Sequence, residues 1–84
     1  MTLQNYKVDT LTLVQNQAVR SDCADITFYN EGTSPVLVNS AITLQQGSSI
    51  VFSANAGEID RTLYNISFVT PGTQKLIVFR KIYI

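Results

Sequence analysis

The chain has 84 residues, six acidic and six basic side chains, no histidine and one cysteine. This length corresponds to one domain over residues 1–84. Cys23 has no partner for an intrachain disulfide, and without histidine no metal site can be built on imidazole. The basic residues are spread along the chain, which argues against nucleic-acid binding, and the first residues lack the long apolar run of a membrane-spanning segment or signal peptide.

Short runs of β-branched and aromatic residues recur from residue 6 to the end, with Gly, Pro, Asn and Ser between them. Helical spacing of apolar residues is hard to find. The pattern predicts strands at residues 6–14, 24–29, 35–39, 41–44, 49–54, 61–69 and 75–84. Residues 14–23 have no assigned strand and are expected to form a crossover between sheets, a short helical turn or an arm that reaches a neighbour.

Two of these segments have one apolar and one mostly polar face, as strands that cover a core do. The residues expected to face the core are Ala24, Ile26, Phe28, Tyr64, Ile66 and Phe68. Short strands with frequent turns predict an all-β fold, either a small antiparallel β-sandwich or a compact jelly-roll-like barrel of about seven strands.

All four glycines fall between the predicted strands, where turns need positive φ. The residues from Asn30 to Gly32 give the sharpest turn signal and predict a hairpin between residues 24–29 and 35–39. Pro71 and Gly72 suit a type II turn, which would make the last two strands neighbours.

The last ten residues, KLIVFRKIYI, would be apolar on both faces of a strand. Leu76, Val78 and Ile82 point to one side, while Ile77 and Phe79 point to the other. A domain of this size has one core, so we expect the second face to contact a neighbouring subunit. The residues predicted for this interface are Ile77, Phe79, Tyr83 and Val51.

No residue pattern indicates an enzyme, a metal site or a cofactor. Cys23 has no histidine to activate it, and Asp22 and Asp25 would raise its pKa, so a buried or half-buried structural thiol is expected. The carboxylates of Glu58 and Asp60 could approach a calcium ion, but the ligand order of a calcium loop is absent and a solvated turn is expected.

A different class of function, a small carbohydrate- or protein-binding module, is the alternative. Its tyrosines could stack on sugars, with Tyr29 and Tyr83 expected to be the most exposed of the set Tyr6, Tyr29, Tyr64 and Tyr83. Its binding loops would be residues 30–34 and 55–60.

Residues 26–68 carry an NEGT turn, a VLVN strand and ITLQQGSSIVF, in which Gly47 separates two apolar runs. In this the chain resembles small virion structural proteins of bacteriophages. The resemblance implies a structural component of the capsid or tail, such as a decoration or vertex protein. Its partners would be other virion proteins and copies of itself in a homo-oligomer, and its location would be the virion, assembled in the host cytoplasm. The low content of charged residues fits a surface used for protein contact.

A chain that ends at Lys75 lacks the strand with two apolar faces, so we expect it to lose folding and assembly together. Circular dichroism and light scattering of the truncated chain measure the two properties. A truncated chain that folds and still assembles would contradict the assignment.

Overall fold

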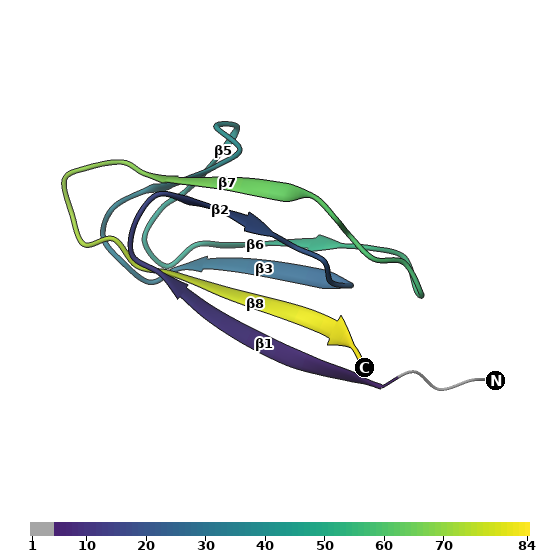
Figure 1. Ribbon diagram of the computed structural model, residues 1–84. Coiled ribbons are helices and arrows are strands. Elements are labelled where there is room, and N and C mark those ends of the chain that lie inside the picture. The colour runs from purple at the N-terminus through teal and green to yellow at the C-terminus, as the bar shows by residue number, and fades with distance from the viewer. Residues whose placement is uncertain (1–4) are drawn as a thin grey trace.

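Two antiparallel sheets of four strands each pack face to face in the computed structural model, which describes residues 5–84 (Figure 1). The strands are β1 (Tyr6–Leu13), β2 (Gln17–Arg20), β3 (Asp25–Asn30), β4 (Val36–Val38), β5 (Ile42–Leu44), β6 (Ser49–Ser53), β7 (Leu63–Phe68) and β8 (Leu76–Tyr83). The first sheet has the order β1-β8-β3-β6 and the second β2-β7-β4-β5. Residues 5–84 contain no helix long and apolar enough to cross a membrane.

Each strand of the first half of the chain pairs with a strand of the second half. The antiparallel pairs are β1 with β8, β2 with β7, β3 with β6 and β4 with β5. The chain is therefore one long hairpin that is rolled up so that its strand pairs alternate between the two sheets. This is the jelly-roll strand order. The predicted all-β antiparallel sandwich is confirmed, with eight strands in place of about seven.

The additional strand is β2, within residues 14–23. This segment crosses from the first sheet to the second, so the expected crossover between sheets is confirmed. The two alternatives, a short helical turn and an arm that reaches a neighbour, are wrong. Of the four residues of β2 only Val19 is buried. A short edge strand with one core residue has too little alternation to be recognised from sequence.

The sequence predicts a hairpin between β3 and β4 and another between β7 and β8. Both predictions are wrong, because the two strands of each pair lie in different sheets. The two connections cross between the sheets side by side and bond to each other. Gly32 N donates to Lys75 O at 2.9 Å, and Ser34 N donates to Thr73 O at 3.0 Å. Turn residues indicate that the chain changes direction, and the sheet it then joins is decided by these long-range contacts.

The tip of the rolled hairpin is the turn between β4 and β5. Asn39 and Ser40 both have positive φ, at 53° and 55°, and Ala41 N donates to Val38 O at 3.1 Å. Positive φ at both central residues defines a type I′ turn, whose twist matches that of antiparallel strands. Asn39 Oδ1 also accepts a hydrogen bond from Asn65 N at 2.8 Å, which fixes the turn against β7.

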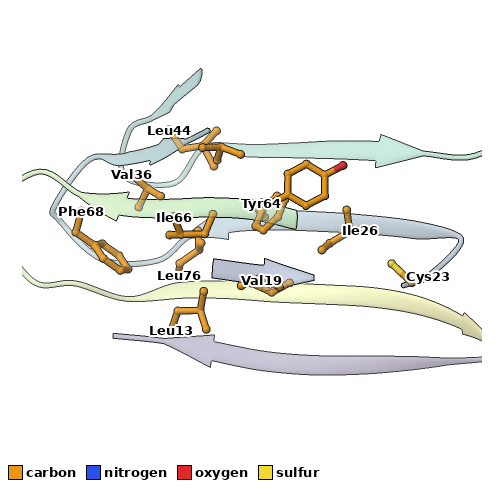
Figure 2. Packing of buried hydrophobic residues seen from close by; sticks show 13 residues of the cluster. Leu13, Val19, Cys23, Ile26, Val36, Leu44, Tyr64, Ile66, Phe68 and Leu76 are labelled. Atoms are coloured by element: carbon orange, nitrogen blue, oxygen red, sulfur yellow. The ribbon is translucent and has the colours of Figure 1, made fainter. Parts of the chain in front are cut away.

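The core is a layer of side chains between the two sheets (Figure 2). All six residues that the sequence predicts to face the core are buried. The rings of Phe28 and Tyr64 meet edge to face across this layer, with centroids 5.3 Å apart. The cluster consists of Leu13, Val19, Cys23, Ile26, Phe28, Val36, Val38, Leu44, Tyr64, Ile66, Phe68, Leu76 and Val78.

Asn30 is a fully buried polar residue that joins the β3–β4 connection to the end of β5. Its Nδ2 donates to Ser34 O at 2.8 Å and to Leu44 O at 2.9 Å, and its Oδ1 accepts from Gly32 N at 3.1 Å. Both polar atoms of the side chain are satisfied, as burial requires. The segment from Asn30 to Ser34 is thus a structural element whose alternate residues are buried.

We expect Gly32→Ala to lower the free energy of unfolding by about 2 to 3 kcal/mol, because the added Cβ would overlap Thr73 O and lie 2.7 Å from Lys75 N. Gly47→Ala is the matched control, since Gly47 has positive φ but open space around it, and should cost only about 1 kcal/mol. Urea unfolding measures both. Equal losses for the two variants would show that the packing of the crossing connections is not the cause.

Candidate interaction surface

The four residues predicted for the interface lie on one face of the first sheet, directed away from the core. Phe79 and Val51 stand on either side of Thr27, because both are opposite it in the antiparallel register. Directly opposed residues share a face, and two strand spacings place the Cα atoms of Phe79 and Val51 about 10 Å apart. Ile77 and Tyr83 point to the same side by alternation along β8.

We use the name apolar face for the outward aromatic and aliphatic residues of the first sheet. Val8 is 60% exposed, Val51 55%, Tyr6 54% and Phe79 37%, while the other three are half-buried. The outer face of the second sheet has mostly small or polar residues, with Leu63 and Leu37 as its large apolar side chains. The apolar face consists of Tyr6, Val8, Tyr29, Val51, Ile77, Phe79 and Tyr83.

Sequence reasoning missed Tyr6 and Val8 as members of the apolar face. The signal was the alternation in β1, where the outward side chains stand opposite those of β8: Tyr6 faces Tyr83, and Val8 faces Lys81. The Nζ atom of Lys81 lies 4.5 Å from the ring centroid of Tyr6, a cation–π contact at the rim of the apolar face. The two outermost strands in the chain, β1 and β8, together supply five of the seven residues of this face.

Tyr83 is fixed by a second contact. Its hydroxyl oxygen accepts a hydrogen bond from Gly57 N at 3.2 Å, in the connection between β6 and β7. This connection is open to solvent, since residues 55–59 are all exposed and Ile59 is 42% exposed. The contact places the loop next to the end of β8, beside the apolar face.

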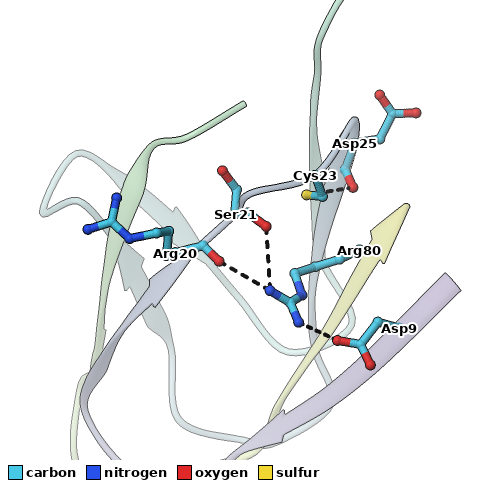
Figure 3. A network of polar contacts seen from close by, with 6 residues as sticks. All are labelled: Asp9, Arg20, Ser21, Cys23, Asp25 and Arg80. Carbon is cyan, nitrogen blue, oxygen red and sulfur yellow. Dashed lines mark hydrogen bonds and ion pairs between the residues drawn. The ribbon is translucent and has the colours of Figure 1, made fainter. Parts of the chain in front are cut away.

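Arg80 projects from β8 toward the core side and links the two sheets at their open end (Figure 3). Its guanidinium pairs with the carboxylate of Asp9 on β1, and its Nη1 donates to the carbonyl oxygens of Arg20 at 3.3 Å and Ser21 at 3.4 Å. The hydrogen bond from Arg80 lowers the pKa of Asp9 below its usual value. The network ties β1 and β8 to the end of β2.

Cys23 is completely buried, the first of the two environments expected for it, and its Sγ donates to Asp25 O at 3.2 Å. Burial raises the pKa of the thiol to about 11, and the nearby carboxylate of Asp60 adds to the effect. Asp22 and Asp25, the cause expected from the sequence, have a secondary effect on the pKa of Cys23, because desolvation of the thiol is the main cause. The thiolate is the reactive form, so Cys23 is held unreactive at neutral pH.

The carboxylate of Asp60 holds the start of the segment that leads to β7. It accepts hydrogen bonds from Thr62 N at 2.9 Å, Thr62 Oγ1 at 2.6 Å and Tyr64 Oη at 2.7 Å. Glu58 is occupied in a similar way, since its Oε1 accepts from Asn55 N at 3.0 Å. Within residues 5–84 no group of three or more potential ligand side chains is arranged to hold a metal ion.

The tyrosines do not follow the expected order of exposure. Tyr29 and Tyr83 are half-buried and Tyr6 is the most exposed, so that expectation is wrong. Tyr64 lies in the core, where burial and the hydrogen bond to Asp60 raise its pKa to about 12. The described residues enclose no pocket, and Tyr6, Tyr29 and Tyr83 lie on the open surface of the apolar face.

Comparisons of this chain with protein-family models, with curated proteins and with solved structures each found no match. The functional interpretation therefore depends on the residues of the chain itself. Two features carry it: the jelly-roll strand order and the apolar face of the first sheet.

We expect Asp60→Asn to reduce the free energy of unfolding at pH 7 by about 1 to 2 kcal/mol, because hydrogen bonds to a charged acceptor are lost. Burial would raise the pKa of Asp60, but the hydrogen bonds from Thr62 and Tyr64 outweigh it and lower the pKa. A lowered folded-state pKa gives stability that is present above the unfolded pKa of about 4 and is lost as the pH falls through the folded value.

The difference between the wild type and Asp60→Asn should therefore shrink as the pH falls below about 4. Urea unfolding at several pH values measures it. Asp22→Asn is the matched control, because Asp22 is exposed and asparagine tolerates its positive φ of 42°. A constant difference from pH 7 to pH 2 would contradict the role of the Asp60 charge.

Proposed function

We propose that this chain is a structural subunit of a virus particle, in the first place a bacteriophage particle. In this proposal it acts through repeated contacts with copies of itself and with other virion proteins in the capsid or tail. The chain has no catalytic step in this function. The contacts are made by the apolar face, which includes the predicted residues Ile77, Phe79, Tyr83 and Val51.

The apolar face is the observation that carries the proposal. Val51 and Phe79 expose large side chains on either side of Thr27, and Tyr6 and Val8 extend the same surface across β8. Contiguous apolar surface on a small domain is typical of a protein contact site. Aromatic residues are enriched at such sites because they bury a large area at low entropic cost.

The strand order supports the same function. Double-sheet jelly rolls occur in viral capsid proteins, and also in lectins and cupins. Fold alone does not assign a function, so the jelly roll adds to the argument from the surface and does not replace it. A small subunit gains most from symmetric assembly, because each copy buries the same apolar patch against a neighbour.

The alternative function, a module that binds carbohydrate or a protein partner, is favoured by one observation. Tyr6, Tyr29 and Tyr83 lie on the same face, and the exposed residues 55–59 stand beside Tyr83. Stacking of sugar rings on these aromatic side chains would use part of the apolar face. A monomer that binds oligosaccharide through this face would establish this alternative.

The test is to purify particles of the virus that encodes the chain on a density gradient and to detect the chain by mass spectrometry. We expect the chain to be present in many copies per particle. Phe79→Asp should reduce its incorporation at least tenfold, because a charge would be buried in the contact. A chain that is expressed during infection and absent from purified particles would overturn the proposal.

Leu63→Asp is the matched control. Leu63 is 46% exposed on the outer face of the second sheet. The substitution therefore places the same charge at a position about as exposed as Phe79 but outside the apolar face. We expect this variant to be incorporated like the wild type. Circular dichroism of both purified variants separates loss of folding from loss of contact.

A further inference from the structure

The outer edge of β1 is an unpaired strand edge in the described part of the chain, because β1 is the first strand of its sheet. The hydrogen bond from Ile84 N to Asn5 O, at 3.0 Å, shows which residues of β1 bond to β8 and which face the unpaired edge. Hydrogen-bonded pairs alternate in an antiparallel ladder, so Lys7, Asp9, Leu11 and Leu13 bond to β8. The N–H and C=O groups of the intervening residues Tyr6, Val8, Thr10 and Thr12 therefore point to the unpaired edge.

The edge of β1 differs from the other three sheet edges in its charges. The edge strand β6 and the edge strand β5 have no charged residue, and β2 has only Arg20. β1 has one charge of each sign, Lys7 and Asp9, on the same side of the strand. Asp9 also pairs with Arg80 through its Oδ2, so a lysine of a second copy would share this carboxylate. Among the described edges, β1 alone has charges of both signs that can meet those of a second copy of itself.

Antiparallel pairing of two β1 strands about a two-fold axis allows few registers, because Val8 and its alternate neighbours must supply the hydrogen bonds on both sides. With Val8 opposite Val8 of the second copy, Lys7 stands opposite Asp9 twice. If the pair is centred on residue 9 instead, Asp9 stands opposite Asp9 of the second copy. If it is centred on residue 7, Lys7 stands opposite Lys7. Centring on Thr10 places both charges against leucines. Opposed unlike charges stabilise a strand pair and like charges destabilise it.

We propose that two copies of this chain join through antiparallel pairing of their β1 strands, with Val8 opposite Val8 of the second copy. This inference rests on the proposal that the chain assembles with itself, and it names the first contact. The two sheets of four strands become one continuous sheet of eight, so two apolar faces merge into one surface. Pairing also removes an edge that would otherwise invite aggregation.

The test is disulfide trapping with Val8→Cys. We expect oxidation of the purified variant to give a covalent dimer on a non-reducing gel, since the Cα atoms of a hydrogen-bonded antiparallel pair lie about 5.5 Å apart, within disulfide range. The native Cys23 does not compete because it is buried. Thr10→Cys is the matched control on the same edge: Thr10 would face Tyr6 of the second copy, about 13 Å from its own equivalent, which is too far for a disulfide.

Light scattering across a concentration series provides the second measurement. We expect the wild type to form dimers or even-numbered assemblies, and Lys7→Glu to raise the dissociation constant of the dimer about tenfold, because two attractive pairs become repulsive. Lys7 is exposed, so the variant keeps the fold.

The outcomes separate this inference from the proposed function. A wild type that stays monomeric at every concentration overturns the pairing and the self-contact together. An oligomer in which Val8→Cys does not cross-link, or in which Thr10→Cys cross-links equally well, overturns the β1 pairing and leaves contact through the apolar face. The presence of the chain in purified particles is decided independently by mass spectrometry.

Discussion

The limit that governs this fold is that one layer of side chains can bury only one face of each sheet. In an 84-residue chain the inner faces of two sheets use up the core, with Phe28 and Tyr64 in contact across it. β8 is apolar on both sides, so Leu76 and Val78 fill the core while Phe79 on the other side stays exposed. The apolar face is the direct consequence, and the proposed contacts follow from it.

The rolled arrangement depends on the two crossing connections and not on the strands alone. Gly32 lets the β3–β4 connection approach the backbone of the β7–β8 connection, and Asn30 bonds the β3–β4 connection to Leu44 at the end of β5. The backbone bonds between the two connections join residues about 40 positions apart in the chain, such as Gly32 and Lys75. The same turn residues could have formed a hairpin, so the long-range backbone bonds select the jelly-roll path.

Local alternation was sufficient to predict the all-β class and the inward residues of β3 and β7, because each of these strands has one buried face. It also placed Val51 and Phe79 on one surface. It could not predict β2, where only Val19 is buried, or the sheet that each strand joins. Tyr6 and Val8 were missed for the same reason, since their place on the apolar face depends on the pairing of β1 with β8, nearly the whole chain apart.

The charges of β1 are explained by the unequal lengths of the strands that cover each other. β1 and β8 have eight residues each and β2 has four, so the first sheet extends beyond the second at one end (Figure 1). The inward positions of β1 change there from leucine to Asp9 and Lys7, and Arg80 bonds to the carbonyl of Arg20 where β2 ends. Charged residues near an edge normally discourage strand pairing. In β1 the two charges, Lys7 and Asp9, have opposite signs and stand two residues apart. They disfavour the registers that oppose like charges and favour the one in which each Lys7 stands opposite Asp9 of the second copy.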